Sequence, residues 1–242
     1  TPVILDWFED DTQIFMVESF INGKSLDLPI SYSEEQVVSV AKKVLNILRR
    51  LHNNNIIYGD IKPANLIADK DGEIYLIDFN SSVIVDEGTS KTEAISGTLG
   101  FSPPEQFNPD RLIDYSSDIY ALGRTMEYLI CPEQFERNSR FPIRYYRRDI
   151  SVELEAILEK MMAPSQSDRY QSVEELLQEF EKYTCTNLLK KFLLLIKSAK
   201  NIHIYKDKNR KNLEKRKEIL HELAVDSQSY TGENDYETVI LN

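Results

Sequence analysis

Two stretches decide how this chain folds: Tyr58-Gly59-Asp60-Ile61-Lys62-Pro63-Ala64-Asn65 and Ile77-Asp78-Phe79-Asn80. Between them we predict two short strands, over Asn65–Ala68 and Glu73–Asp78, because Asp71-Gly72 favours a tight hairpin turn. An acid, a cation and an amide before the hairpin, with a second acid after it, can orient a hydroxyl, neutralise phosphate and hold Mg²⁺. The pattern therefore predicts a phosphoryl-transfer site formed by Asp60, Lys62, Asn65 and Asp78.

Hydrophobic periodicity predicts strands before this centre and helices on both sides of it. The ranges 3–8 and 13–21 are apolar-rich and are separated by Glu9-Asp10-Asp11, which is a hairpin pattern. Ser33 and Gln36 form a capping box, and the apolar spacing that follows predicts a helix over 34–53. Further helices are predicted over 116–130, 151–162 and 173–183.

Length and composition place the chain among packed proteins. With 242 residues, 41% of them apolar, the chain is long enough for one or two domains, and disorder of the whole chain is excluded. The net charge of −11 works against generic binding to nucleic acid or anionic membranes. Cys131 and Cys185 lack metal-ligand spacing, and the longest purely apolar run, Phe192–Ile196, is too short to span a bilayer. We expect a soluble protein of the reducing cytoplasm.

Charge divides the chain into three zones. The net charges are −14 over residues 1–183, +8 over 184–220 and −5 over 221–242. We interpret the zones as a globular domain over 1–183, a basic helical extension over 184–222 and an acidic, disordered tail over 223–242. Residues 187–197 are apolar around most of a helix, so we expect this segment to pack onto the domain.

Five elements in family order carry a resemblance to protein kinases. The first stretch resembles the catalytic loop H-R-D-x-K-x-x-N of that family, and Asp78-Phe79-Asn80 resembles its D-F-G motif. Gly97–Glu105 is similar to the end of an activation segment, and Asp114–Gly123 to the start of the buried central helix. Arg169 lies where the family places an arginine that pairs with the glutamate of A-P-E. The resemblance covers about residues 1–183 and points to bacterial Hanks-type serine/threonine kinases with the I-K-P-A-N form.

The resemblance implies an α+β, protein kinase-like fold. Residues 1–21 would form small-lobe strands and the hinge, and residues 22–183 would form the mainly helical large lobe. The β-hairpin of the catalytic centre would lie in that large lobe.

The same resemblance implies roles in ATP-dependent phosphoryl transfer. Asp60 would accept or orient the proton of the attacking hydroxyl, and Lys62 would steady the transferring phosphoryl group. Asn65 and Asp78 would hold Mg²⁺. Lys62 two residues after the acid, together with Thr98, implies serine or threonine of a protein as the substrate.

Nucleotide binding is expected on both sides of the hinge. Ile67 would form the floor under the adenine, and the backbone of Ser19 to Ile21 would bond its edge. The expected cofactors are ATP and Mg²⁺, and the expected nucleotide-binding residues are Ser19, Ile21, Lys62, Asn65, Ile67 and Asp78.

Several differences from the family pattern bear on activity. Gly59 replaces the arginine that reads an activation-loop phosphate, so phosphate control should be weaker or different. Asn80 replaces the glycine of D-F-G, and Glu18 takes the expected gatekeeper position. A glycine-rich loop and a V-A-I-K-like lysine do not occur upstream, so we interpret the chain as a fragment of a longer kinase. A missing small lobe or a partner would complete the sheet at Val3–Phe8.

Two other functions stay open at this stage. A pseudokinase scaffold fits the absent lysine and glycine loop, but all four catalytic residues are retained. A small-molecule kinase of the antibiotic phosphotransferase type fits Gly59-Asp60, but Pro103-Pro104-Glu105 and the helix at Asp118 argue against it. Upstream coding sequence with a glycine-rich loop would favour the protein kinase.

The end of the chain suggests a partner. Thr238 follows acids and precedes apolar residues, which resembles the phosphothreonine tails that forkhead-associated domains bind in bacterial kinase systems. We interpret the basic stretch Lys206–Lys217 as an exposed helix face without specific nucleic-acid binding.

Overall fold

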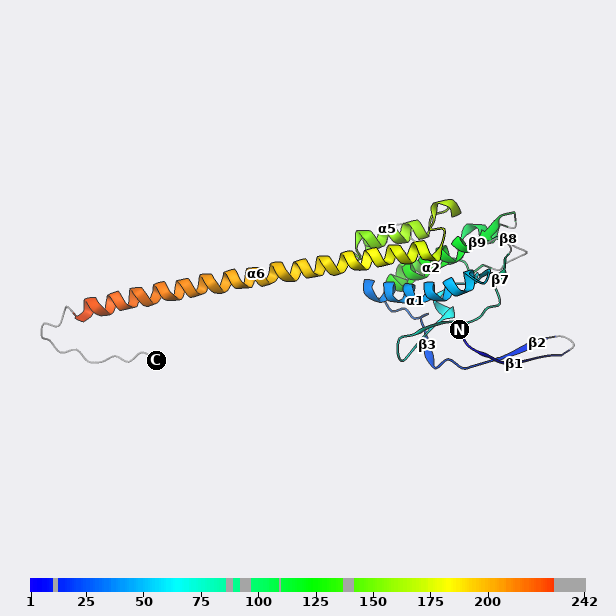
Figure 1. Cartoon of the computed structure of the whole chain (residues 1–242), viewed down its shortest axis with the longest axis horizontal. Helices are drawn as coiled ribbons and strands as arrows, with labels where there is room; N and C mark the ends of the chain where they lie inside the picture. The colour runs from blue at the N-terminus through cyan, green and yellow to red at the C-terminus, as the bar shows by residue number, and fades with distance from the viewer. Residues whose placement is uncertain (11–12, 86–88, 92–96, 109, 137–141, 229–242) are drawn as a thin grey trace. The chain divides into compact units, whose positions relative to one another are not determined.

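The structure, a computed structural model, describes residues 1–10, 13–85, 89–91, 97–108, 110–136 and 142–228 (Figure 1). The chain divides into two compact units, Thr1–Thr184 and Cys185–Asn242. Thr238, the residue of the forkhead-associated hypothesis, lies outside the described residues.

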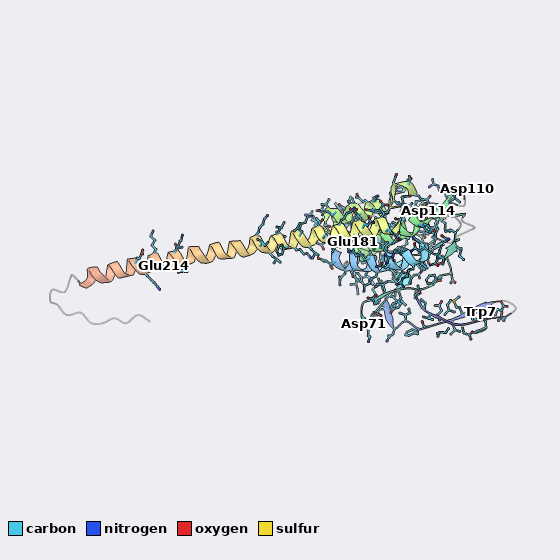
Figure 2. The ribbon with its side chains drawn as sticks, in the orientation of Figure 1. Trp7, Asp71, Asp110, Asp114, Glu181 and Glu214 are labelled. Atoms are coloured by element: carbon cyan, nitrogen blue, oxygen red, sulfur yellow. The ribbon has the colours of Figure 1, made fainter. Side chains whose placement is uncertain are left out.

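The first unit opens with the expected hairpin. Strands β1 (Ile4–Glu9) and β2 (Ile14–Glu18) pair antiparallel, with Trp7 opposite Met16. Strand β1 has the predicted length of six residues, moved by one position, whereas β2 has five residues and is shorter than the predicted range 13–21. Many of their large apolar side chains are exposed, Trp7 among them (Figure 2).

A three-stranded antiparallel sheet contains the hairpin that links the two motif stretches. Its order is β3 (Gly23–Ser25), β5 (Leu66–Asp69) and β6 (Ile74–Leu76), so β3 runs beside the hairpin. Ser25 pairs with Ile67, and Ile67 pairs with Tyr75. The turn between β5 and β6 is the tight Asp-Gly turn that the sequence predicts.

Two shorter strand pairs frame the segment after the hairpin. Strand β4 (Ile56–Ile57) pairs with β7 (Val83–Ile84). Strand β8 (Thr89–Lys91) pairs with β9 (Leu112–Asp114), which leads directly into a helix. The β8–β9 pair joins residues more than twenty positions apart, and we did not predict it.

Six α-helices and three short 3₁₀ helices lie in the described residues. The α-helices are α1 (Glu34–His52), α2 (Tyr115–Ile130), α3 (Pro132–Glu136), α4 (Ile143–Tyr146), α5 (Val152–Met161) and α6 (Val173–Gln228). The 3₁₀ helices are η1 (Pro63–Asn65), η2 (Pro104–Phe107) and η3 (Gln166–Asp168).

Helices α1 and α2 supply much of the core of the first unit. The predicted capping box starts α1, because Ser33 accepts the Gln36 amide N–H and the Gln36 side chain accepts the Ser33 amide N–H. The inward face of α1 is fully buried at Val37, Val44 and Leu48. In α2, buried residues occur on almost every side, as expected for the central helix of a helical lobe.

Helix α6 combines two segments that the sequence analysis treated separately. A helix was expected over 173–183, a helical extension over 184–222 and a disordered tail from 223, whereas one continuous helix runs from Val173 to Gln228. The stretch contains no glycine or proline that could end it. Six apolar side chains of the second unit are 49–67% exposed: Leu188, Leu189, Phe192, Leu193, Leu194 and Leu195. Within the described residues, the structure has no helix with enough length and hydropathy to cross a membrane.

Candidate active site

A buried carboxylate fixes the backbone just before Asp60. Asp118, in the first turn of α2, is fully buried and accepts the backbone N–H groups of Tyr58 and Gly59, both at 2.9 Å. The ring of His52 lies 2.9 Å from the same carboxylate. Because three groups converge on Asp118, the backbone just before Asp60 is fixed to the helical core.

Asp60 is the centre of the cluster that follows. Lys62 Nζ lies 2.7 Å from Asp60 Oδ2, and the Thr98 hydroxyl donates to Asp60 Oδ1 at 2.6 Å. The amide nitrogen of Asn65 donates to Asp60 Oδ2 at 2.9 Å and to the Asp60 carbonyl at 3.0 Å. Lys62 Nζ also donates to the Thr98 hydroxyl at 3.0 Å. Three of the four predicted catalytic residues therefore meet in one hydrogen-bonded group, and Thr98 joins it.

The second predicted acid, Asp78, follows β6 in a left-handed conformation with φ of 62°. It is connected to the loop through its neighbours: the Ile77 N–H donates to the Asn65 carbonyl at 3.1 Å, and the Tyr58 hydroxyl donates to the Ile77 carbonyl. Phe79 packs edge-on against Tyr58, with ring centroids 5.2 Å apart. Tyr58, which lies where the H-R-D motif has its histidine, therefore packs against Phe79.

The pKa of Tyr58 is affected by the carboxylates of this site. Burial raises the pKa of its hydroxyl above the usual range, and the carboxylates of Asp60 and Asp78 raise this pKa further. Both acids therefore lie within electrostatic range of the Tyr58 hydroxyl.

Gly59 adopts a conformation that explains its identity. Its φ is +83°, and a Cβ atom built there would lie 2.6 Å from the Ser81 carbonyl oxygen. Its own carbonyl accepts the Gln106 side chain at 2.6 Å. The arginine that most protein kinases have at this position does not fit this backbone, because its Cβ would overlap a main-chain atom.

Glu105 and Arg169 form a buried ion pair that ties the activation segment to the helical core. Arg169 donates to the two oxygens of Glu105 at 2.5 and 2.9 Å, and Ser117 donates to Glu105 at 2.9 Å. Arg169 also donates to the carbonyls of Ala163 and Pro164 at 2.8 and 3.3 Å. The relative exposures are 0% for Glu105 and 2% for Arg169. The pair expected from the sequence is therefore present, with its polar atoms bonded.

The expected nucleotide-binding residues lie in two places. Ser19 and Ile21 line a cavity of about 310 Å³ together with Phe20, Lys70 and Tyr75. The Ser19 N–H donates to the Val3 carbonyl at 2.8 Å, so that amide takes part in the strand pair. Ile67 is half-buried in β5 and is not among the residues that line this cavity.

The sequence analysis missed part of the site. It used Thr98 only to assign a substrate class, whereas the structure places the Thr98 hydroxyl on both Asp60 and Lys62. It did not single out Gln106 or His52, which fix the Gly59 carbonyl and Asp118. The sequence feature that could have identified Thr98 as a site residue is its place in the Gly97-Thr98 motif. For Gln106, the corresponding feature is its place directly after Glu105.

Comparison with known proteins agrees with this geometry. The family model of the protein kinase domain matches residues 3–195. Serine/threonine-protein kinase B of Synechocystis sp. is 32% identical over 202 residues, which cover 76% of this chain and 35% of the relative. PknA of Nostoc sp., another serine/threonine-protein kinase, is 29% identical over 197 residues, 74% of this chain and 35% of the relative. An Aurora kinase of Dictyostelium discoideum is 28% identical over 183 residues, 70% of this chain and 46% of the relative.

The chain belongs to the protein kinase domain family. It spans about a third of the length of the bacterial relatives that it matches.

Proposed function

We propose that this chain carries the phosphoryl-transfer site of a serine/threonine protein kinase that uses ATP and Mg²⁺. The observation that carries the proposal is the convergence of Lys62, Asn65 and Thr98 on the carboxylate of Asp60. The bacterial relatives whose names specify serine/threonine kinases support the substrate class.

Asp60 would act on the acceptor hydroxyl. Its Oδ1 atom accepts the Thr98 hydroxyl at 2.6 Å, so the carboxylate is placed to accept an O–H donor from the side of the activation segment. As the acceptor oxygen bonds to the terminal phosphorus of ATP, its proton moves to Asp60, and the bond between that phosphorus and the oxygen of ADP breaks. Lys62, 2.7 Å from Asp60, would stabilise the negative charge of the phosphoryl group in transfer.

Asn65 and Asp78 fit a magnesium ion by the chemistry of their donors. The Asn65 nitrogen donates twice to Asp60, so the amide oxygen is the atom of this side chain that can ligate a cation. With the Asp78 carboxylate it offers the hard oxygen ligands that Mg²⁺ prefers. When bound, Mg²⁺ neutralises phosphate charge. The two hydrogen bonds from Asn65 also keep the Asp60 carboxylate in one orientation.

Product analysis tests the proposal. The protein, as its organism makes it, is incubated with γ-labelled ATP, Mg²⁺ and a protein acceptor, and the labelled amino acids are separated after hydrolysis. We expect phosphoserine and phosphothreonine, which are lost in Asp78→Asn and retained in Asp71→Asn, an exposed turn residue (Figure 2). Label on a small molecule in place of protein would favour the phosphotransferase alternative. ATP binding without transfer would favour the pseudokinase and would overturn the proposal.

A further inference from the structure

Residues 185–195 of α6, in the second unit, include a group of exposed apolar side chains. We call residues 185–202 of α6 the apolar segment. Leu188, Phe192 and Leu195 are 62%, 59% and 67% exposed, and Cys185 is exposed as well. An apolar helix face of this size is typical of a surface that another helix covers.

The spacing of the apolar residues is that of a coiled-coil seam. Apolar residues recur at alternating intervals of three and four along the segment, which places them on one stripe of a supercoiled helix. They are Cys185, Leu188, Phe192, Leu195, Ala199 and Ile202. On one flank of this stripe lie Leu189 and Ile196, and on the other Lys191 and Ser198. The apolar surface therefore extends beyond the seam only on the flank that holds Leu189 and Ile196.

This stripe is complementary to itself when two copies run in opposite directions. With the pairing centred between Leu193 and Leu194, the seam residues meet in six layers of three kinds, each present twice: Cys185 with Ile202, Leu188 with Ala199, and Phe192 with Leu195. In the same arrangement Leu189 lies beside Ile196 of the second copy, so the two apolar flanks meet. Contact of one surface patch with its own copy is the requirement of a two-fold symmetric dimer.

Charge distribution favours the antiparallel over the parallel arrangement. The helix continues into Lys206–Lys217, which holds seven Lys or Arg against two acids. Arg210 and Glu214 of this stretch pair within one helix at 3.4 Å (Figure 2 labels Glu214). Parallel helices would hold two such stretches about 10 Å apart, close to the Debye length, so their repulsion would persist. In the antiparallel pair the stretches lie at opposite ends, about 50 Å apart at 1.5 Å per residue.

We propose that residues 185–202 of α6 pair with the same segment of a second copy as an antiparallel two-stranded coiled coil. This self-association surface belongs to the second unit and is independent of the proposed phosphoryl transfer.

The oligomeric mass of the full chain is the first test. Light scattering after size-exclusion chromatography should give the mass of two chains, and Leu188→Glu/Leu195→Glu should give the mass of one chain with an unchanged circular dichroism melting of the first unit. Leu194→Glu is the matched control, because Leu194 is 64% exposed but lies outside the seam, and it should stay dimeric. A wild-type mass of one or four chains, or a dimer that survives Leu188→Glu/Leu195→Glu, would overturn the proposal.

Disulfide trapping tests the direction of the helices. Cys185 is exposed and Cys131 is buried, so Cys185 is the native thiol open to cross-linking. Mild oxidation should trap a covalent dimer of Ile202→Cys, in which Cys185 of one copy and the new thiol at position 202 of the other share a layer. The wild type and Cys185→Ser/Ile202→Cys, which lack this pair of thiols, should stay uncross-linked. A Cys185–Cys185 disulfide in the wild type would mean parallel helices and would refute the antiparallel arrangement.

Discussion

The buried pair of Arg169 and Glu105 should be the most sensitive point of the fold. The change Arg169→Met removes both bonds to Glu105, at 2.5 and 2.9 Å, and the bonds to the carbonyls of Ala163 and Pro164. Glu105, with no exposed surface, then retains Ser117 as its side-chain donor. Breaking a buried pair by removing one partner costs about 3–5 kcal/mol. At about 2–4 °C per kcal/mol for a protein of this size, the midpoint of thermal unfolding should fall by roughly 6–20 °C.

Thermal unfolding followed by circular dichroism measures this effect, with Arg210→Met as the matched control. Arg210 also pairs with a glutamate, at 3.4 Å, but it is 79% exposed, and an exposed pair contributes about 0–1 kcal/mol. The double variant Arg169→Met/Glu105→Leu should be more stable than Arg169→Met, because it no longer buries an unpaired acid. If Arg169→Met and Arg210→Met shift the midpoint equally, burial of the pair does not have the importance that we assign to it.

Three further changes test other parts of the site and core. Gly59→Ala should lower the free energy of unfolding more than Gly72→Ala. Both glycines have positive φ, which costs an L residue about 1–2 kcal/mol, but only at Gly59 would the new Cβ lie 2.6 Å from the carbonyl oxygen of Ser81. Equal urea midpoints of the two variants would refute this. Thr98→Val should lower the rate of phosphoryl transfer about tenfold at unchanged thermal stability, because it removes hydrogen bonds to the two charged groups of Asp60 and Lys62. Thr98→Ser should keep the wild-type rate. An unchanged rate in Thr98→Val would contradict the proposal that Thr98 positions these two side chains. Burial raises the pKa of Tyr170 to about 12, so its contribution to stability is complete below pH 10 and is lost as the pH rises towards 12. Over this pH range, urea titrations should show a smaller loss of stability for Tyr170→Phe than for the wild type. Parallel pH profiles would show that Tyr170 does not ionise there.

Local signals in the sequence predicted much of the fold. The Ser33–Gln36 capping box and the spacing of the apolar residues after it placed α1 to within one residue of its end. The Asp71-Gly72 turn placed the catalytic hairpin. The order of the motifs predicted a protein kinase, and the family match confirms it.

Contacts between distant residues could not be predicted in the same way. The pairing of β8 with β9 depends on how the segment after Asp78 returns to the start of α2, and neither strand has the alternating pattern of a half-buried strand. Gly59 has φ of +83° and lies close to the Ser81 carbonyl, a contact that the local sequence does not encode. The two hydrogen bonds of Thr98 likewise join residues that are 36 and 38 positions apart in the sequence. The predicted roles of Asp60, Lys62, Asn65 and Asp78 stay predictions until transfer is measured.

The most direct test of the central claim is the rate of phosphoryl transfer by the protein, as its organism makes it, with Asp60 changed to Asn. Asp60→Asn keeps the size of the side chain but replaces one acceptor oxygen by an amide NH₂ group and removes the group that takes the proton. At saturating ATP and Mg²⁺ we predict a fall in the rate of about 10²–10⁴-fold, the usual contribution of a general base, with little change in thermal stability and with Asp71→Asn at the wild-type rate. A wild-type rate in Asp60→Asn would contradict the assignment of Asp60 as the residue that accepts the proton of the attacking hydroxyl.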